Sequence, residues 1–140
     1  MYWANRNICF VVCALACAPW PVSARSRDLT KAEAQKLVAA ALGPQVTSLP
    51  RFGFDDLEYS DPKARDFYTF EVGYYNPGGS GIIGHYAVHR ATGNVWELIA
   101  CKRLDARELR TLQSLLRKRI GLRADELKRL NDVSPCYAPD

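Results

Sequence analysis

The sequence predicts an α+β fold in which an antiparallel sheet of about four strands packs against an N-terminal helix and a C-terminal leucine-rich helix. Three observations predict this fold. Residues 66–101 alternate apolar and polar side chains around two turn sequences, which is typical of three consecutive antiparallel strands. Apolar residues at helical spacing precede this segment at residues 30–43 and follow it at residues 105–121. The chain has 140 residues, 48% of them hydrophobic, which is enough for one domain.

The N-terminus has the pattern of a signal peptide. A basic residue lies near its start, residues 8–18 form an apolar run, and small residues precede a cleavage position after Ala24. This run is about half of the ~20 residues that a membrane-spanning helix needs. We therefore expect a signal peptide at residues 1–24 and a mature domain at residues 25–140, which is periplasmic or secreted. A lipoprotein signal that ends at Cys17 is the alternative, so free and lipid-anchored forms both stay open.

Removal of the signal peptide leaves two of the five cysteines, Cys101 and Cys136. A cysteine pair in an exported chain is typical of a disulfide. This bond would tie the C-terminal tail to the end of the third strand, with a stabilisation of about 3–4 kcal/mol in the chain-entropy treatment. A nucleophilic cysteine is the competing interpretation, and no histidine is close in sequence to either thiol.

Both predicted helices begin with a capping-box sequence. Residues 30–33 open the first helix, which the Gly-Pro pair at residues 43–44 ends. Residues 105–108 open the second helix, which ends at Gly121. A shorter amphipathic run follows at residues 124–130.

In the sequence, one of these helices precedes the predicted sheet and the other follows it, and together they set the limits of the domain. One further strand, at residues 52–59, precedes the three-strand segment. The core of the domain is therefore predicted at residues 29–121, and the short helix and disulfide-bonded tail at residues 122–140.

Alternation assigns the side chains of the first two strands of the segment to two faces, because neighbouring strand residues point to opposite sides. One face should carry Tyr68, Phe70, Val72, Tyr74, Ile82, Tyr86 and Val88, and the other Thr69, Glu71, Gly73, His85, Ala87 and His89. Residues 95–100 are apolar on both sides apart from Glu97, which predicts a central strand or one covered by a helix. Gly93 should supply a positive φ in the turn before that strand.

The glycine-rich sequence NPGGSG, residues 76–81, joins the first two strands and predicts a hairpin loop longer than two residues. Aromatic and aliphatic residues flank it. A small rigid scaffold with such a loop favours an inhibitor whose loop enters the cleft of a partner. The partner-binding residues that this hypothesis names are Tyr75, Asn76, Gly78, Gly79, Ser80 and Ile82. A flexible tip without function is the alternative.

The histidines give little support to an enzyme. His85 and His89 share a face but lie about 13 Å apart along a strand, too far to bind one metal ion. Glu71 lies opposite His85, so the two could act as an acid–base pair, or more simply form a cross-strand pair. No nucleophile elbow, phosphate-binding loop or HExxH sequence is present. We therefore expect no catalytic residue, no metal and no cofactor, with a small envelope enzyme that uses Glu71 and His85 as an alternative.

Basic residues are concentrated in the last third of the chain. They include Arg103, Arg107, Arg110, Arg117, Lys118, Arg119, Arg123, Lys128 and Arg129. The leucines between them face a core, which favours a solvated helix surface over nucleic-acid binding. A structural envelope protein that binds anionic surfaces through this basic helix is a further alternative. The oligomeric state stays open.

The sequence TKAEAQKLVAAALG, followed by FYTFEVGYY and HYAVHRATGNVWEL, resembles PepSY-like domains over roughly residues 29–98. The matching positions are Glu33, Ala34, Tyr86, Val88, Thr92, Gly93 and Val95. The order of elements also resembles cystatin-like and nuclear-transport-factor-like immunity proteins that bacteria export to neutralise toxins. The resemblance implies an exported, non-enzymatic inhibitor or immunity protein. Its protein partner would be an envelope or secreted enzyme, such as a peptidase or a cell-wall hydrolase.

Overall fold

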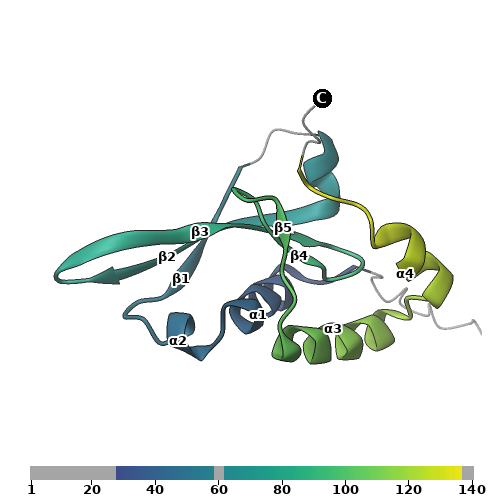
Figure 1. The fold of residues 1–140 in the computed structure, drawn as a ribbon, viewed down its shortest axis with the longest axis horizontal. Helices are drawn as coiled ribbons and strands as arrows, with labels where there is room; N and C mark the ends of the chain where they lie inside the picture. The colour runs from purple at the N-terminus through teal and green to yellow at the C-terminus, as the bar shows by residue number, and fades with distance from the viewer. Residues whose placement is uncertain (1–27, 59–61, 137–140) are drawn as a thin grey trace, which may run out of the picture.

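The computed structural model describes residues 28–58 and 62–136 (Figure 1). The expected signal peptide and the Cys17 anchor lie outside the described residues. The helices are α1 (Lys31–Leu42), α2 (Pro44–Thr47), the 3-10 helix η1 (Pro62–Asp66), α3 (Arg107–Ile120) and α4 (Ala124–Leu130). The strands are β1 (Gly53–Asp56), β2 (Phe67–Asn76), β3 (Gly79–His89), β4 (Val95–Glu97) and β5 (Lys102–Arg103).

The five strands form one antiparallel sheet in the order β1-β2-β3-β4-β5, so each strand pairs with its neighbour in the chain. Helices α1 and α3 pack against each other below one face of this sheet (Figure 1). We call this the helix face, and the opposite one the outer face. The predicted α+β fold with an N-terminal and a leucine-rich C-terminal helix is confirmed, with one strand more than expected.

The hydrophobic core lies between the helix face and the two helices. Its buried members are Leu29, Ala34, Leu37, Val38, Phe70, Val72, Tyr86, Val88, Val95 and Leu109. Alternation had placed Phe70, Val72, Tyr86 and Val88 on one face, and burial of the apolar area of the core provides the main stabilisation of the domain. The core therefore fixes which face of the sheet is left for a partner.

The first predicted helix start is confirmed and the second is wrong. In α1, Thr30 Oγ1 accepts from the Glu33 amide and the Glu33 carboxylate accepts from the Thr30 amide. In α3 the N-cap is Ala106, which has no side-chain acceptor. Asp105 instead pairs with Arg110, at 2.7 Å between Oδ1 and Nη1. A carboxylate one residue too early cannot accept from the amides of the first turn, so it forms a surface ion pair.

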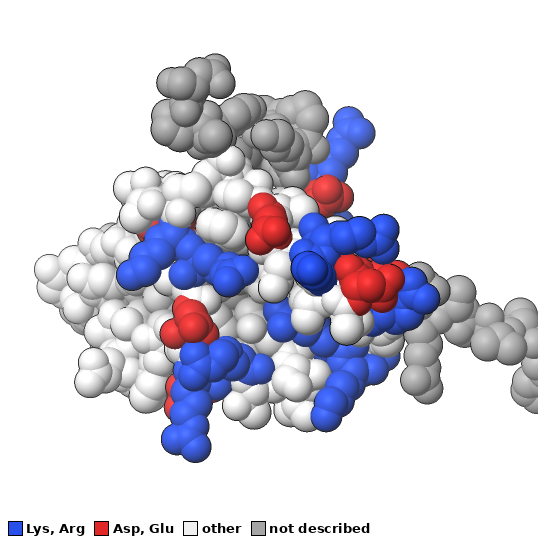
Figure 2. Space-filling view, turned by 45° about the vertical axis from the view of Figure 1, so that its right-hand side comes forward, with Lys and Arg blue, Asp and Glu red and all other residues white. Residues whose placement is uncertain are grey.

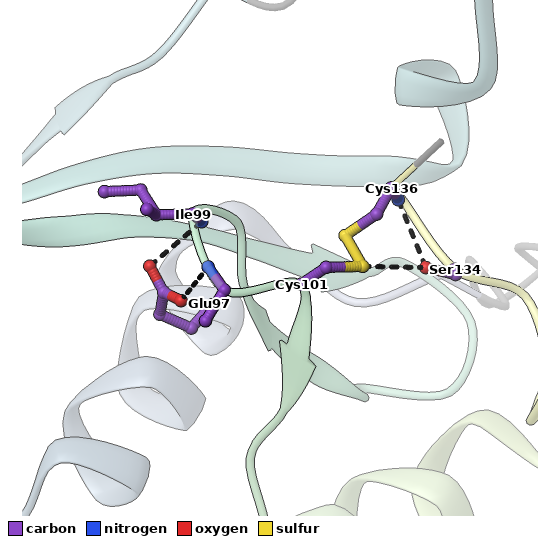
Figure 3. The surroundings of a disulfide bond; sticks show 6 residues. Glu97, Ile99, Cys101, Ser134 and Cys136 are labelled. Atoms are coloured by element: carbon purple, nitrogen blue, oxygen red, sulfur yellow. Dashed lines mark hydrogen bonds between the residues drawn. A yellow bond between two sulfur atoms is a disulfide. The ribbon is translucent and has the colours of Figure 1, made fainter. Parts of the chain in front are cut away.

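Two strands are shorter than the sequence predicts. β1 has four residues, because the chain pairs with β2 only from Gly53 to Asp56. β4 ends at Glu97, whose carboxylate accepts hydrogen bonds from the amides of Ile99 and Ala100 and turns the chain (Figure 3). The chain then returns as β5, which the sequence did not predict.

The loop between β2 and β3 is shorter than predicted. Pairing continues to Asn76 and Gly79, so only Pro77 and Gly78 lie between the strands. The Asn76 side chain accepts from the Gly78 amide, and Gly79 has a φ of +142° that favours glycine. The prediction of a longer loop was wrong, because Ser80 and Gly81 belong to β3.

A β-bulge in β3 corrects the predicted position of Ile82. Val72 pairs with Gly84 and Gly73 with Ile82, which leaves Ile83 as an extra residue in β3. Ile83 packs against the core, whereas Ile82 is 64% exposed. The extra residue interrupts the alternation, so Ile82 leaves the face that it was predicted to share with Tyr86.

The disulfide joins Cys101 to Cys136, as the cysteine count predicts (Figure 3). Cys101 lies in the turn between β4 and β5 and has a φ of +50°. Cys136 follows α4, and its amide donates to Ser134 Oγ at 3.1 Å. The bond therefore fixes the tail after α4 to one end of the sheet.

His89, at the end of β3, is a buried histidine with a structural role. It is 4% exposed, and its Nδ1 accepts hydrogen bonds from the amides of Ala91 and Thr92. Its ring contacts the Phe67 ring edge to face, with centroids 5.1 Å apart. A ring nitrogen that accepts two amide hydrogens cannot also carry a proton, so the fold favours neutral His89.

The stability of the fold should therefore decrease as the pH falls through the ordinary pKa range of histidine. Burial lowers the pKa of His89 in the folded chain, and the nearby Asp66 and Asp28 only partly oppose it. Below a pH of about 6.5 the unfolded chain binds this proton before the folded chain does. Thermal unfolding of the native chain at pH 7.5 and 5.5 should show a larger decrease in Tm than the same measurement on His89→Gln. Equal decreases would contradict this assignment.

Candidate protein-binding site on the outer face

The hairpin of β2 and β3 extends past its neighbouring strands (Figure 1). β1 pairs with β2 no farther than Gly73, and β4 pairs with β3 only as far as Tyr86. The end of the hairpin, residues 74–82, therefore projects away from the body of the sheet. A projecting hairpin with a two-residue turn is well suited to contact another protein.

Strand register places three rows of side chains across the outer face. The acidic row contains Asp55, Glu71 and His85; the glycine row contains Gly53, Gly73 and Ile82; the tip row contains Tyr75 and Ser80, with Arg51 beside Tyr75. The first two rows cross β1, β2 and β3, and the tip row lies nearest the turn. The order of these rows gives the outer face a negative inner end and an aromatic tip.

A hollow of about 720 Å³ lies over these rows. It is lined by Arg51, Gly53, Phe54, Asp55, Glu71, Gly73, Tyr74, Tyr75, Ser80, Gly81 and Ile82. Most of these residues belong to the outer face by register. The glycine pair Gly53 and Gly73 has no side chains, so it forms the floor of the hollow between the acidic row and the tip row.

Two exposed apolar side chains flank this hollow. Tyr75 is 50% exposed and Ile82 is 64% exposed. The Arg51 guanidinium lies 5.0 Å from the centroid of the Tyr75 ring, and this cation–π contact helps to fix the ring. Exposed aromatic and aliphatic anchors beside a hollow are typical of the centre of a protein interface.

The structure separates the residues that the sequence predicted for binding into two groups. Tyr75, Ser80 and Ile82 line the hollow. Asn76, Gly78 and Gly79 form the turn beyond it and shape the end of the hairpin.

Sequence reasoning missed the contribution of β1. Arg51, Gly53 and Asp55 line the hollow because β1 pairs with β2. Nothing in the local sequence of residues 51–55 reveals this register. The Gly53–Gly73 pair becomes visible only when the two strands are aligned.

Glu71 and His85 meet as the sequence predicts. They are paired in register, and Glu71 Oε2 lies 3.1 Å from His85 Nε2. Each side chain is about one third exposed. Glu71 lines the inner end of the hollow, and His85 lies beside it on β3. Within residues 28–58 and 62–136, no cluster of three or more His, Cys, Asp or Glu side chains could hold a metal ion.

The basic C-terminal segment is less available to a partner than its sequence suggests. Arg110 pairs with Asp105, Arg119 with Glu33 and Arg123 with Asp125. Arg117 is partly buried and donates to Thr92 O and to Asn94 Oδ1. Figure 2 shows acidic side chains among the basic ones on this side of the molecule. Among the described helices, none has the length and apolar character needed to span a membrane.

Comparison with known proteins identifies a relative. A solved structure of a type VI secretion system effector–immunity complex from Pseudomonas protegens contains a chain with 30% sequence identity and a TM-score of 0.62. The alignment covers 79% of this chain and 92% of that one. The chain belongs to the same family as that component. No family model matches the chain, and no curated protein matches it.

The family relationship extends over most of this chain and nearly all of the relative. The aligned stretch is a larger share of the relative than of this chain, so the relative is the shorter of the two. The resemblance to PepSY-like and cystatin-like proteins stays a prediction.

Proposed function

We propose that the chain is the immunity member of an effector–immunity pair: an exported, non-enzymatic protein that binds a toxic effector and blocks it. The observation that carries the proposal is its family relationship to a component of such a complex. The disulfide supports it, because a structural disulfide is typical of proteins in oxidising compartments outside the cytoplasm. The periplasm, or the exterior of the cell, is the location that fits both observations.

The effector would bind at the outer face of the β2–β3 hairpin. Core packing uses the helix face, so the outer face near the tip is the part of the sheet that a partner can reach. Its hollow offers a concave surface, and Tyr75 and Ile82 offer apolar area. A peptidase or a cell-wall hydrolase is the class of effector that the proposal names.

The two other interpretations have weaker structural support. Glu71 and His85 form a hydrogen-bonded pair, but it lies on an open sheet surface where water weakens the electrostatic effects that acid–base catalysis relies on. A structural protein that binds anionic surfaces would need free basic side chains on the C-terminal helices. Several of these are paired with carboxylates.

The proposal is tested by capture followed by neutralisation. Residues 25–140, tagged and immobilised, are incubated with the secreted proteins of the source organism, and any retained protein is purified. We expect one protein that is toxic when it is delivered to the periplasm of a susceptible cell, and no longer toxic when this chain is co-expressed there. Retention of a harmless protein, or of none, would overturn the immunity assignment.

Removal of both apolar anchors should weaken that complex without weakening the fold. The double variant Tyr75→Ala/Ile82→Ser should bind the captured effector at least tenfold more weakly, because central anchors carry most of the energy of an interface. Ile99→Ser/Leu115→Ser is the matched control, since these side chains are 78% and 59% exposed elsewhere on the surface. Calorimetric titration measures affinity and thermal unfolding measures stability. Equal affinities for the two double variants would place the interface elsewhere.

A further inference from the structure

We propose that the hollow on the outer face receives a basic side chain, arginine or lysine, from the protein partner, with Asp55 and Glu71 as its acceptors. The inference deepens the proposed function and rests on it for the statement that the partner is a protein. It follows from the charge, the shape and the orientation of the hollow.

The first argument is a pair of neighbouring carboxylates that the fold satisfies only in part. Asp55 and Glu71 lie directly opposite each other in the register of β1 and β2. Like charges in this position destabilise a sheet. Glu71 uses Oε2 to bind His85, while Asp55 makes no hydrogen bond or ion pair with the described part of the chain. A cation placed at these carboxylates would remove the repulsion and satisfy the unused oxygens.

The second argument is the glycine floor. A Cβ at Gly73 would lie 3.2 Å from Gly81 O, so close packing accounts for that glycine. A Cβ at Gly53 would have its nearest contact at 3.9 Å, and Gly53 does not have a positive φ. Backbone geometry therefore does not require glycine at position 53. What the missing side chain provides is space in the hollow, in which the aliphatic stem of an arginine or lysine can lie.

The third argument is the direction of the charge along the hollow. Its inner end carries Asp55 and Glu71, whereas its tip carries Arg51 over the Tyr75 ring. A basic side chain that enters from the tip is repelled by Arg51 and attracted by the carboxylates. Its charged end is therefore directed inward, and Tyr75 and Ile82 are left to contact apolar groups of the partner.

The binding test uses short peptides and needs no effector. Acetyl-Gly-Arg-Gly-amide, its lysine analogue and the neutral acetyl-Gly-Gln-Gly-amide are titrated into residues 25–140 while amide NMR signals of Gly53, Gly73 and Tyr75 are followed. We expect saturable shifts with the two basic peptides, with a Kd of ~1 mM. The affinity should decrease as salt is added, because salt screens the attraction between charges. Identical behaviour of the glutamine peptide would overturn the proposal.

Three variants test which residues bind the peptide. Asp55→Asn should weaken binding of the arginine peptide at least fivefold, and Gly53→Val should abolish it by filling the floor. Asp56→Asn is the matched control, because Asp56 follows Asp55 in β1 and points to the opposite face, where it pairs with Lys31. It should bind like the native chain. If Asp55→Asn also binds like the native chain, Asp55 is not an acceptor and the proposal fails.

A stability measurement separates a binding role of Asp55 from a structural one. If Asp55 serves a partner, Asp55→Asn should leave the Tm of the unbound chain unchanged or raise it, because the substitution removes repulsion with Glu71. A decrease in Tm would show that Asp55 supports the fold, and would overturn its assignment to binding.

The outcomes for the hollow and for the immunity function can be told apart. If the basic peptide binds and its binding requires Asp55, but no effector is neutralised by the chain, the role of the hollow is supported and the immunity function is contradicted. An effector that is neutralised equally by the native chain, Asp55→Asn and Gly53→Val contradicts the hollow and supports the immunity function.

Discussion

Loss of the disulfide between Cys101 and Cys136 is expected to lower the free energy of unfolding by about 3–4 kcal/mol. The bond closes a loop across a sequence separation of 35 residues, and this loop contains β5, α3 and α4. Without it the unfolded chain gains the conformations that the closed loop forbids. For a domain of this size, the decrease in Tm should be roughly 10–20 °C.

Thermal unfolding of Cys101→Ser/Cys136→Ser, followed by circular dichroism, measures the effect. The native chain is measured with and without a thiol reductant, and reduction should shift its Tm to that of the double variant. The reductant should leave the double variant itself unchanged. A native chain whose Tm does not respond to complete reduction would contradict the expected contribution of the disulfide.

The parts of the fold that the sequence predicts are those that depend on short-range physics. Thr30 and Glu33 cap α1 because their spacing alone brings the side chains to each other's amides. Phe70 and Val88 lie on the helix face because side chains alternate along any strand. Glu71 and His85 also meet as predicted, although this pairing needs the extra residue Ile83, because the two-residue turn alone would place Gly84 opposite Glu71.

The predictions that failed in the β2–β3 hairpin depend on a single residue of register. The tight turn at Pro77 and Gly78 and the extra residue Ile83 together change which β3 side chains face outward. One inserted residue reverses the assignment of Ile82, and composition carries no sign of it. The hollow was missed for the same reason, because Gly53 and Asp55 reach it only through the pairing of β1 with β2.

Arg117 illustrates how a charge pattern can hide a structural residue. In the sequence it is one of ten basic residues in the last third of the chain. In the fold its Nε donates to Thr92 O at 2.6 Å and its Nη2 donates to Asn94 Oδ1 at 2.9 Å. Burial, together with the nearby Arg103, lowers the pKa of Arg117. The guanidinium therefore holds the turn between β3 and β4 against α3.

Replacement of Arg117 by leucine should lower the free energy of unfolding by about 2–4 kcal/mol, because two acceptors in a buried turn lose their donors at ~1–3 kcal/mol each. Thr92 and Asn94 are both buried, so water cannot readily replace the guanidinium. Lys118→Leu is the control, since Lys118 is the next residue of α3 and is exposed. It should change the stability by less than ~0.5 kcal/mol.

Urea unfolding distinguishes the two interpretations of the basic helix. If Arg117 fixes the turn, Arg117→Leu should lower the midpoint concentration of urea with an unchanged slope, and Lys118→Leu should not. Arg117→Lys should also be destabilised, because an ammonium cannot reproduce two donors in the fixed geometry of a guanidinium. If the leucine variants at 117 and 118 unfold alike, Arg117 does not fix the turn.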